Sequence, residues 1–123
     1  MAGEPYKYVG GTSNTVPLSE TLDCIREALD LIKQRAHLVV NPGTQFNEVL
    51  TATYLEGQKM SYHSDDEKRL GPIIASLSLG SPATMHFRRC AMSANRKEIA
   101  LSLIIRHGDV LIMEGHDVQS DYD

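Results

Sequence analysis

The sequence predicts a mainly β domain of the α+β class, with one helix followed by about six short strands. Helical spacing of apolar residues occurs in one clear stretch, residues 17–36. From residue 46 onward, runs with alternating or β-branched residues are separated by turn residues about every 8–12 residues, which is typical of a β-sandwich, barrel or jelly roll. Strands and helices do not alternate, so a doubly wound fold is not expected.

Length and composition favour one small domain over residues 1–123. The chain is 41% hydrophobic and 23% charged, which is ordinary for a globular protein with a modest core. Its net charge of −4 gives no basic footprint, so any nucleic-acid role must come from a local patch. The composition does not indicate an oligomeric state.

The location expected from the sequence is the cytoplasm or the nucleus. The two cysteines, Cys24 and Cys90, form no spacing motif and suggest a reducing compartment. The first residues are polar and do not resemble a signal peptide. No apolar run approaches the roughly 20 residues that cross a membrane, so no membrane partner is expected.

The first element expected is a strand over residues 5–10. Tyr6 and Tyr8 alternate there, which places both rings on one face. These rings suit a half-buried sheet edge, or a platform on which a flat substrate such as a base could stack.

The predicted helix covers residues 17–36, with Ser19 as its N-cap. Glu20 and Asp23 lie in its first turn and Lys33 and Arg35 near its end, where the helix dipole favours each charge. We expect this helix to pack on the outside of a sheet. Its apolar stripe consists of Leu18, Leu22, Ile25, Leu29, Ile32 and Ala36.

The predicted strands follow between residues 46 and 113, each bounded by Gly, Pro or Asn turns. A tight turn is expected at His107, Gly108 and Asp109, and the tail from residue 115 onward is polar. The strands are expected at residues 46–54, 59–65, 73–79, 83–89, 99–105 and 110–113.

His63 and Asp65 are the candidate metal ligands. On a strand, side chains two residues apart point to the same face, roughly 7 Å apart along the chain. An imidazole and a carboxylate so placed could converge on one ion, as two arms of the 2-His-1-carboxylate triad that holds non-haem Fe(II). The alternative interpretation is that residues 63–65 form a surface turn.

The motifs around this pair resemble AlkB-like Fe(II)/2-oxoglutarate-dependent dioxygenases over nearly the whole chain. No single motif is specific, whereas their order and spacing together are. The motifs are Tyr6-Lys-Tyr8-Val-Gly10, Phe46-Asn47-x-Val49-Leu50, Tyr54-x-x-Gly57, His63-Ser-Asp65-Asp66-Glu67, Leu70-Gly71-Pro72, Ile74-Ala-Ser-Leu-Ser-Leu-Gly80, Phe87-Arg88 and His107-Gly108-Asp109-Val-Leu-Ile-Met113-x-Gly115.

The resemblance implies a jelly-roll (double-stranded β-helix) core and oxidative removal of an alkyl group, typically methyl, from bases of DNA or RNA. It also implies Fe(II), 2-oxoglutarate as cosubstrate, and O₂. A base in a duplex would have to be flipped out to reach the iron.

Residue by residue, the resemblance implies that His63 and Asp65 are iron ligands and that Tyr54 hydrogen-bonds 2-oxoglutarate. It places Tyr6, Tyr8 and Glu67 against the target base. Two residues before the tyrosine the family usually has an Asn cosubstrate contact, and this chain has Ala52, so Thr51 or Thr53 would have to compensate.

The third iron ligand of the family would fall at position 124, and the sequence given ends at Asp123. The strands beyond it, with an arginine that binds the 2-oxoglutarate carboxylate, are therefore absent from the expected domain. We expect weakened iron binding, with His116 or Asp123 as substitute ligands, and low stability for an isolated monomer.

Three functions remain open from the sequence. The first is an AlkB-like dioxygenase that demethylates nucleic-acid bases. The second is a truncated, non-catalytic family remnant, and the third is a dioxygenase that acts on a small molecule or a protein. Whether the chain is an enzyme depends on the iron site.

Overall fold

The computed structural model describes residues 2–3, 16–65, 71–90 and 98–123. The chain divides into two compact units, Met1–Lys59 and Met60–Asp123, and each is described by itself. The prediction of one domain over residues 1–123 stays a prediction. Among the described residues, no helix is long and apolar enough to cross a membrane.

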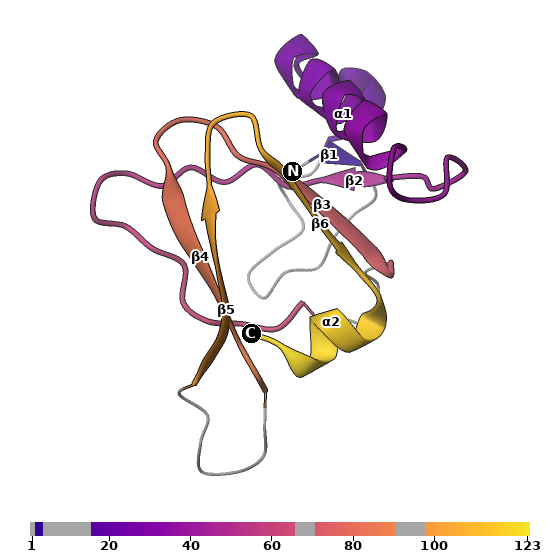
Figure 1. The fold of residues 1–123 in the computed structure, drawn as a ribbon. Coiled ribbons are helices and arrows are strands. Elements are labelled where there is room, and N and C mark those ends of the chain that lie inside the picture. The colour runs from indigo at the N-terminus through magenta and orange to yellow at the C-terminus, as the bar shows by residue number, and fades with distance from the viewer. Residues whose placement is uncertain (1, 4–15, 66–70, 91–97) are drawn as a thin grey trace. The chain divides into compact units, whose positions relative to one another are not determined.

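The first unit combines a helical segment with a small antiparallel strand pair (Figure 1). Strand β1 (Ala2–Gly3) pairs with β2 (Glu48–Val49). The short 3-10 helix η1 (Leu18–Glu20) precedes helix α1 (Asp23–Ala36). The buried apolar side chains among the described residues all belong to this unit: Leu29, Ala36 and Val40.

The predicted helix is confirmed in its body and wrong at its start. Thr21 has extended backbone angles, φ −73° and ψ 161°, which separate η1 from α1. Leu22 is the N-cap of α1 and makes no side-chain capping hydrogen bond, so Ser19, inside η1, is not the cap. Asp23 in the first turn and Lys33 and Arg35 in the last are confirmed, whereas Glu20 ends η1 and is not in the first turn of α1.

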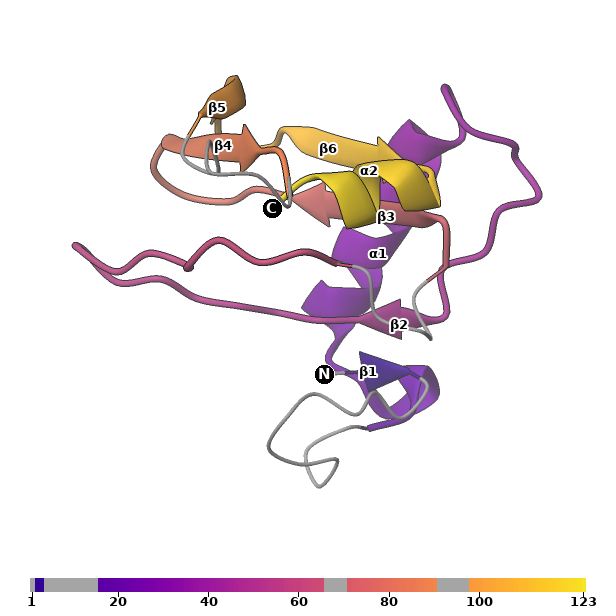
Figure 2. The ribbon, with the colours of Figure 1, turned by 90° about the horizontal axis from the view of Figure 1, so that it is seen from below.

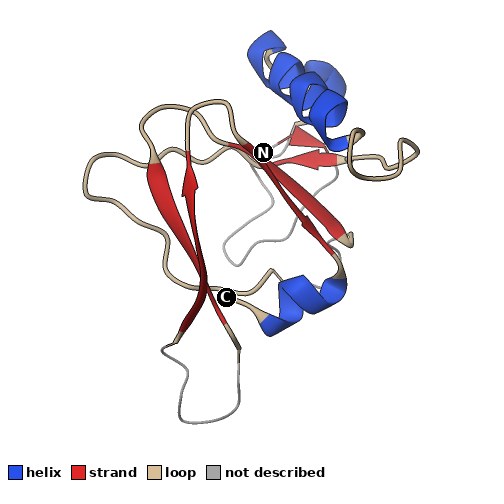
Figure 3. Ribbon diagram, in the orientation of Figure 1, coloured by secondary structure: helices blue, strands red, loops and turns tan. Residues whose placement is uncertain are grey.

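The two predicted strands that flank residue 57 are largely wrong. The strand expected over residues 46–54 is reduced to β2, and residues 59–65 form no strand (Figure 3, tan). Strand propensity needs a partner, and among the described residues β2 pairs with β1, Ala2 with Val49 and Gly3 with Glu48. The turn at Gly57 between them is confirmed, with φ 79° and a hydrogen bond from the Gln58 N–H to the Leu55 carbonyl.

The second unit contains two antiparallel strand pairs, one nested within the other in sequence. Strand β3 (Ile73–Leu77) pairs with β6 (Val110–Glu114), and the hairpin of β4 (Ala83–Arg88) and β5 (Ile99–Ile105) lies between them in sequence (Figures 1 and 2). All four strands confirm the prediction.

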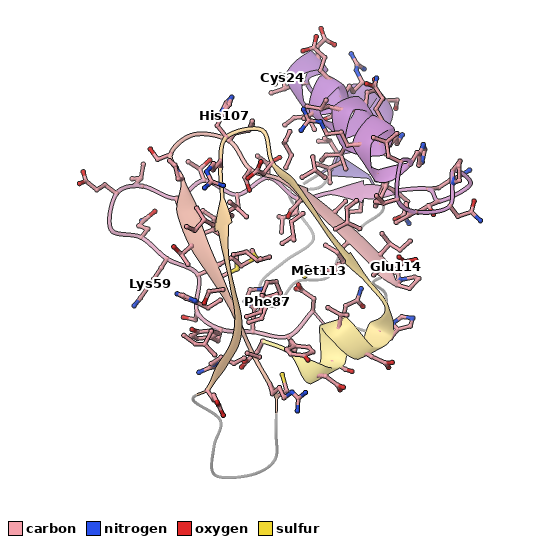
Figure 4. All side chains as sticks on the ribbon, in the orientation of Figure 1. Cys24, Lys59, Phe87, His107, Met113 and Glu114 are labelled. Carbon is pink, nitrogen blue, oxygen red and sulfur yellow. The ribbon has the colours of Figure 1, made fainter. Side chains whose placement is uncertain are left out.

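One labelled side chain from each strand pair points toward the other pair. The Phe87 side chain on β4 and the Met113 side chain on β6 point toward each other (Figure 4). Both are half-buried, which agrees with their apolar positions in the alternating pattern.

Tight turns hold the ends of the two pairs together. Gly108 has φ 86°, and its N–H donates to the Ser78 carbonyl at 2.7 Å. The Asp109 carboxylate accepts from the Arg106 N–H at 2.7 Å, which closes the predicted turn. The Gly80 N–H donates to Nδ1 of His107 at 3.0 Å. This hydrogen bond joins the connection between β3 and β4 to the connection between β5 and β6.

A second helix, α2 (His116–Asp121), was not predicted in the polar tail. Gln119 is its buried residue, 3% exposed, and the Gln119 side-chain amide donates to the Gly71 carbonyl at 3.0 Å. The Gly115 N–H donates to the Pro72 carbonyl at 2.7 Å. These bonds attach α2 to the start of β3. The mainly β class with one longer helix is confirmed.

Candidate metal centre

His63 and Asp65 converge although their segment forms no strand. Nε2 of His63 lies 3.6 Å from Oδ1 of Asp65. The imidazole is 50% exposed and the carboxylate 35%, so both donors face accessible space. The sequence predicted this convergence from strand geometry, and here it arises within residues 60–65, which we call the ligand segment.

The hydrogen bond of the other ring nitrogen makes Nε2 the available donor atom. Nδ1 of His63 lies 2.9 Å from the Ser61 carbonyl oxygen. A carbonyl oxygen only accepts hydrogen bonds, so Nδ1 carries the proton in the neutral ring. The lone pair then sits on Nε2, the nitrogen that faces Asp65. Holding Nδ1–H on a backbone carbonyl is a common way to orient a histidine that binds a metal.

This donor set fits a divalent first-row transition metal such as Fe(II). A neutral imidazole nitrogen and a carboxylate oxygen are two of the three donors of the facial triad. Among the described residues, no group of three or more His, Cys, Asp or Glu side chains could hold a metal ion. His63 and Asp65 are therefore two candidate ligands and not a complete described site.

Among the described residues, the two substitute ligands considered from the sequence form no three-residue metal group with His63 and Asp65. His116 is the first residue of α2 and is exposed. Both carboxylate oxygens of Asp123 accept hydrogen bonds from Arg88, so that carboxylate already has a strong cationic partner. We assign neither residue as a ligand. The remaining histidines hydrogen-bond within their own units: His37 to Thr44, His86 to Ser102 and His107 to Gly80.

The other predicted site residues are described only in part. Tyr54 belongs to the first unit, and the residue is half exposed. Tyr6, Tyr8 and Glu67 lie outside the described residues. Their predicted contacts with cosubstrate and base stay predictions.

Arg88 organises a contact cluster that the sequence did not predict. Its guanidinium carbon lies 3.5 Å from the centre of the ring of Tyr62, which is the residue before His63 in the chain. Its Nε and Nη2 donate to the two Asp123 oxygens at 3.1 and 2.7 Å. These hydrogen bonds raise the pKa of Arg88 above its ordinary value, and the Asp123 charge acts in the same direction.

The backbone reinforces this cluster. Arg88 and Asp123 exchange two N–H···O bonds of 2.8 and 2.9 Å, and the Cys90 N–H donates to the Asp121 carbonyl at 2.7 Å. Residues 88–90 therefore pair antiparallel with residues 121–123. The Phe87-Arg88 motif was the one sequence signal at this place.

The chain matches the family model of the 2OG-Fe(II) oxygenase superfamily over residues 1–122. The chain belongs to the 2OG-Fe(II) oxygenase superfamily. The mainly β architecture fits the jelly-roll core of this superfamily, whose name gives Fe(II) and 2-oxoglutarate as its metal and cosubstrate.

Within this superfamily, the chain is similar to proteins named alpha-ketoglutarate-dependent dioxygenase alkB homolog 3. The human protein is 38% identical over 82 residues, which are 61% of this chain and 29% of the relative. The rat protein is 34% identical over 88 residues, 66% of this chain and 30% of the relative. The bovine protein is 34% identical over 92 residues, 69% of this chain and 32% of the relative.

The chain spans about a third of the length of the curated relatives that it matches. No solved structure matches it significantly. The family match and these relatives confirm the resemblance to AlkB-like proteins that the motifs indicated.

Proposed function

We propose that the chain contains the iron-binding part of an AlkB-like Fe(II)/2-oxoglutarate-dependent dioxygenase that demethylates nucleic-acid bases or a related substrate. The single observation that carries the proposal is the convergence of His63 Nε2 and Asp65 Oδ1 at 3.6 Å, in a chain of this superfamily. The relatives named alkB homolog 3 support the AlkB-like chemistry.

In this proposal each residue has a limited role. The neutral His63 donates the Nε2 lone pair to the metal while Ser61 holds Nδ1–H, and Asp65 supplies an anionic oxygen that offsets part of the metal charge. When bound, iron with 2-oxoglutarate and O₂ supplies the oxidising chemistry that attacks the alkyl carbon.

Tyr54 is proposed to orient the cosubstrate. Its phenol is a donor as well as an acceptor, so it can donate to a carboxylate oxygen of 2-oxoglutarate. The half exposure of Tyr54 leaves the residue accessible for that contact. Tyr6, Tyr8 and Glu67 are proposed to contact the alkylated base, because aromatic rings stack on bases and a carboxylate accepts from their amino groups.

We also propose a cytoplasmic or nuclear location. Cys24 and Cys90 are the two cysteines of the sequence and form no spacing motif, which is typical of proteins in reducing compartments.

Anaerobic titration with Fe(II) and 2-oxoglutarate tests the proposed centre through its visible charge-transfer band. We expect a band for the full chain, and loss of the band in His63→Ala and in Asp65→Asn. His86→Ala is the matched control, because His86 is an exposed histidine on β4 that bonds Ser102. A band that survives His63→Ala would contradict the assignment.

The substrate is tested separately by formaldehyde release under O₂. We expect release from oligonucleotides that carry N-methylated bases, and none from the unmethylated oligonucleotides. Turnover of 2-oxoglutarate without release from any oligonucleotide would indicate a small-molecule or protein substrate. Absence of both the band and turnover would indicate a non-catalytic family member.

A further inference from the structure

Arg88 joins two segments that are far apart in sequence. On one side its guanidinium covers the ring of Tyr62, and on the other it binds the carboxylate of Asp123 in a two-pronged arrangement. All three residues belong to the second unit. Arg88 and Asp123 are only 24% and 23% exposed, so water screens their ion pair less than it would screen a fully exposed pair.

A side-chain contact links the ligand segment to the end of β4. Residues 60–65 are described and belong to no strand. The Ser61–His63 hydrogen bond is local and orients the ring only relative to its own segment. The contact between Tyr62 and Arg88 connects the residue before His63 to the end of β4.

The end of β4 is shaped to present Arg88. The β4–β5 register shifts between Phe87 and Arg88, and such bulges redirect a side chain from its alternating position. His86 on the same strand is exposed, whereas Arg88 is largely covered. Two backbone hydrogen bonds to Asp123 fix the main chain of Arg88. The side chain that contacts Tyr62 therefore starts from a fixed Cα position.

From this geometry we propose that Arg88 is a positioning residue for the metal centre: through Tyr62 it holds His63 and Asp65 in the metal-binding arrangement, with Asp123 fixing its guanidinium. The proposal rests on the proposed function, because it concerns the same two ligands. Arg88 itself touches neither metal nor substrate in this role. Arginine suits it, because one planar group can stack on a ring and bind a carboxylate with two parallel N–H donors.

Binding of Co(II) to the full chain tests the proposal without catalysis. Co(II) accepts the same nitrogen and oxygen donors as Fe(II), and its visible bands report the coordination geometry. Replacing a group that orients a metal ligand typically weakens metal binding about 10- to 100-fold. We therefore expect Arg88→Gln to weaken Co(II) binding at least about tenfold and to change the visible bands.

The matched control is Arg89→Gln, which removes the same charge one residue further on, from an exposed side chain. We expect its affinity to stay within about twofold of the wild type. Tyr62→Phe keeps the ring and should retain binding, whereas Tyr62→Leu should weaken it like Arg88→Gln. Arg88→Lys keeps a cation without the two-pronged geometry and should fall between Arg88→Gln and the wild type.

Each variant is titrated well below its own melting temperature, measured by circular dichroism. A folded Arg88→Gln variant with wild-type affinity and bands would overturn the proposal, whatever its melting temperature, because a purely structural role changes only that temperature. If Arg88→Gln does not fold, wild-type binding by Tyr62→Leu overturns it. Co(II) binding that is unaffected by His63→Ala would overturn the proposed centre and this inference together. If His63→Ala abolishes Co(II) binding and Tyr62→Leu leaves it unchanged, this inference alone is overturned.

Discussion

The side-chain amide of Gln119 donates to the carbonyl oxygen of Gly71 at 3.0 Å, and Gln119 is 3% exposed. A polar side chain from α2 thus donates a hydrogen bond to a backbone carbonyl group just before β3. This bond gives a helix of polar composition a fixed place in the second unit.

Gln119→Ala removes that donor and leaves the Gly71 carbonyl without it. We expect a loss of about 1–3 kcal/mol in the free energy of unfolding, the usual cost of a buried polar group deprived of its partner. Urea titration followed by circular dichroism measures the change. Ser120→Ala, at an exposed neighbouring position, is the control and should change stability by less than about 0.5 kcal/mol. Equal effects of the two substitutions would contradict this role for Gln119.

Gly108→Ala tests the turn between β5 and β6. Nothing lies within 4 Å of an added Cβ, so the cost comes only from the φ of 86° that a side chain disfavours. We expect destabilisation by about 1 kcal/mol, seen as a lower urea midpoint. Gly71→Ala is the matched control, since its Cβ would also meet open space and its φ is not left-handed. A loss at Gly71 as large as that at Gly108 would exclude backbone conformation as the cause.

Leu29→Ala tests the buried face of α1. Leu29 is 7% exposed, and truncating a buried leucine costs about 2–5 kcal/mol. Leu38 is 82% exposed, so Leu38→Ala should be nearly neutral. Hydrogen exchange of the α1 amides is the measurement. Unchanged protection in Leu29→Ala would show that the helix does not depend on this contact.

The raised pKa of Arg88 predicts a pH-independent contribution across the neutral and mildly alkaline range. A base whose pKa is raised by folding stabilises the folded state fully below the pKa of the unfolded chain, and loses that effect only as pH rises through the higher folded value. We therefore expect the difference in melting temperature between the wild type and Arg88→Gln to stay constant from about pH 7 to 10. A difference that disappears toward pH 10 would contradict the Arg88–Asp123 pairing as its source.

The sequence predicted the local features of the candidate site, because they depend on near neighbours. His63 and Asp65 are two residues apart, so their convergence needs only the backbone between them. The strands β3 to β6 were found from alternation and from turns such as Gly108. The expected strand over residues 59–65 failed because pairing depends on a partner that local sequence does not reveal.

The features that escaped prediction depend on distant partners. Arg88 and Asp123 are separated by 35 positions, and the chain offers many other oppositely charged pairs. Helix α2 is short and polar, and its attachment uses Gln119 and a backbone carbonyl rather than an apolar stripe. The prediction of low stability for the isolated chain stays untested.

The antiparallel pairing of residues 88–90 with residues 121–123 has a consequence for the order of folding. Contacts between distant residues close large loops and form slowly, whereas hairpins such as β4–β5 form early. The His63–Asp65 pair is local and can form before the second unit is complete. Arg88 receives its Asp123 partner only at the closing step, so we expect high-affinity metal binding to develop late during refolding.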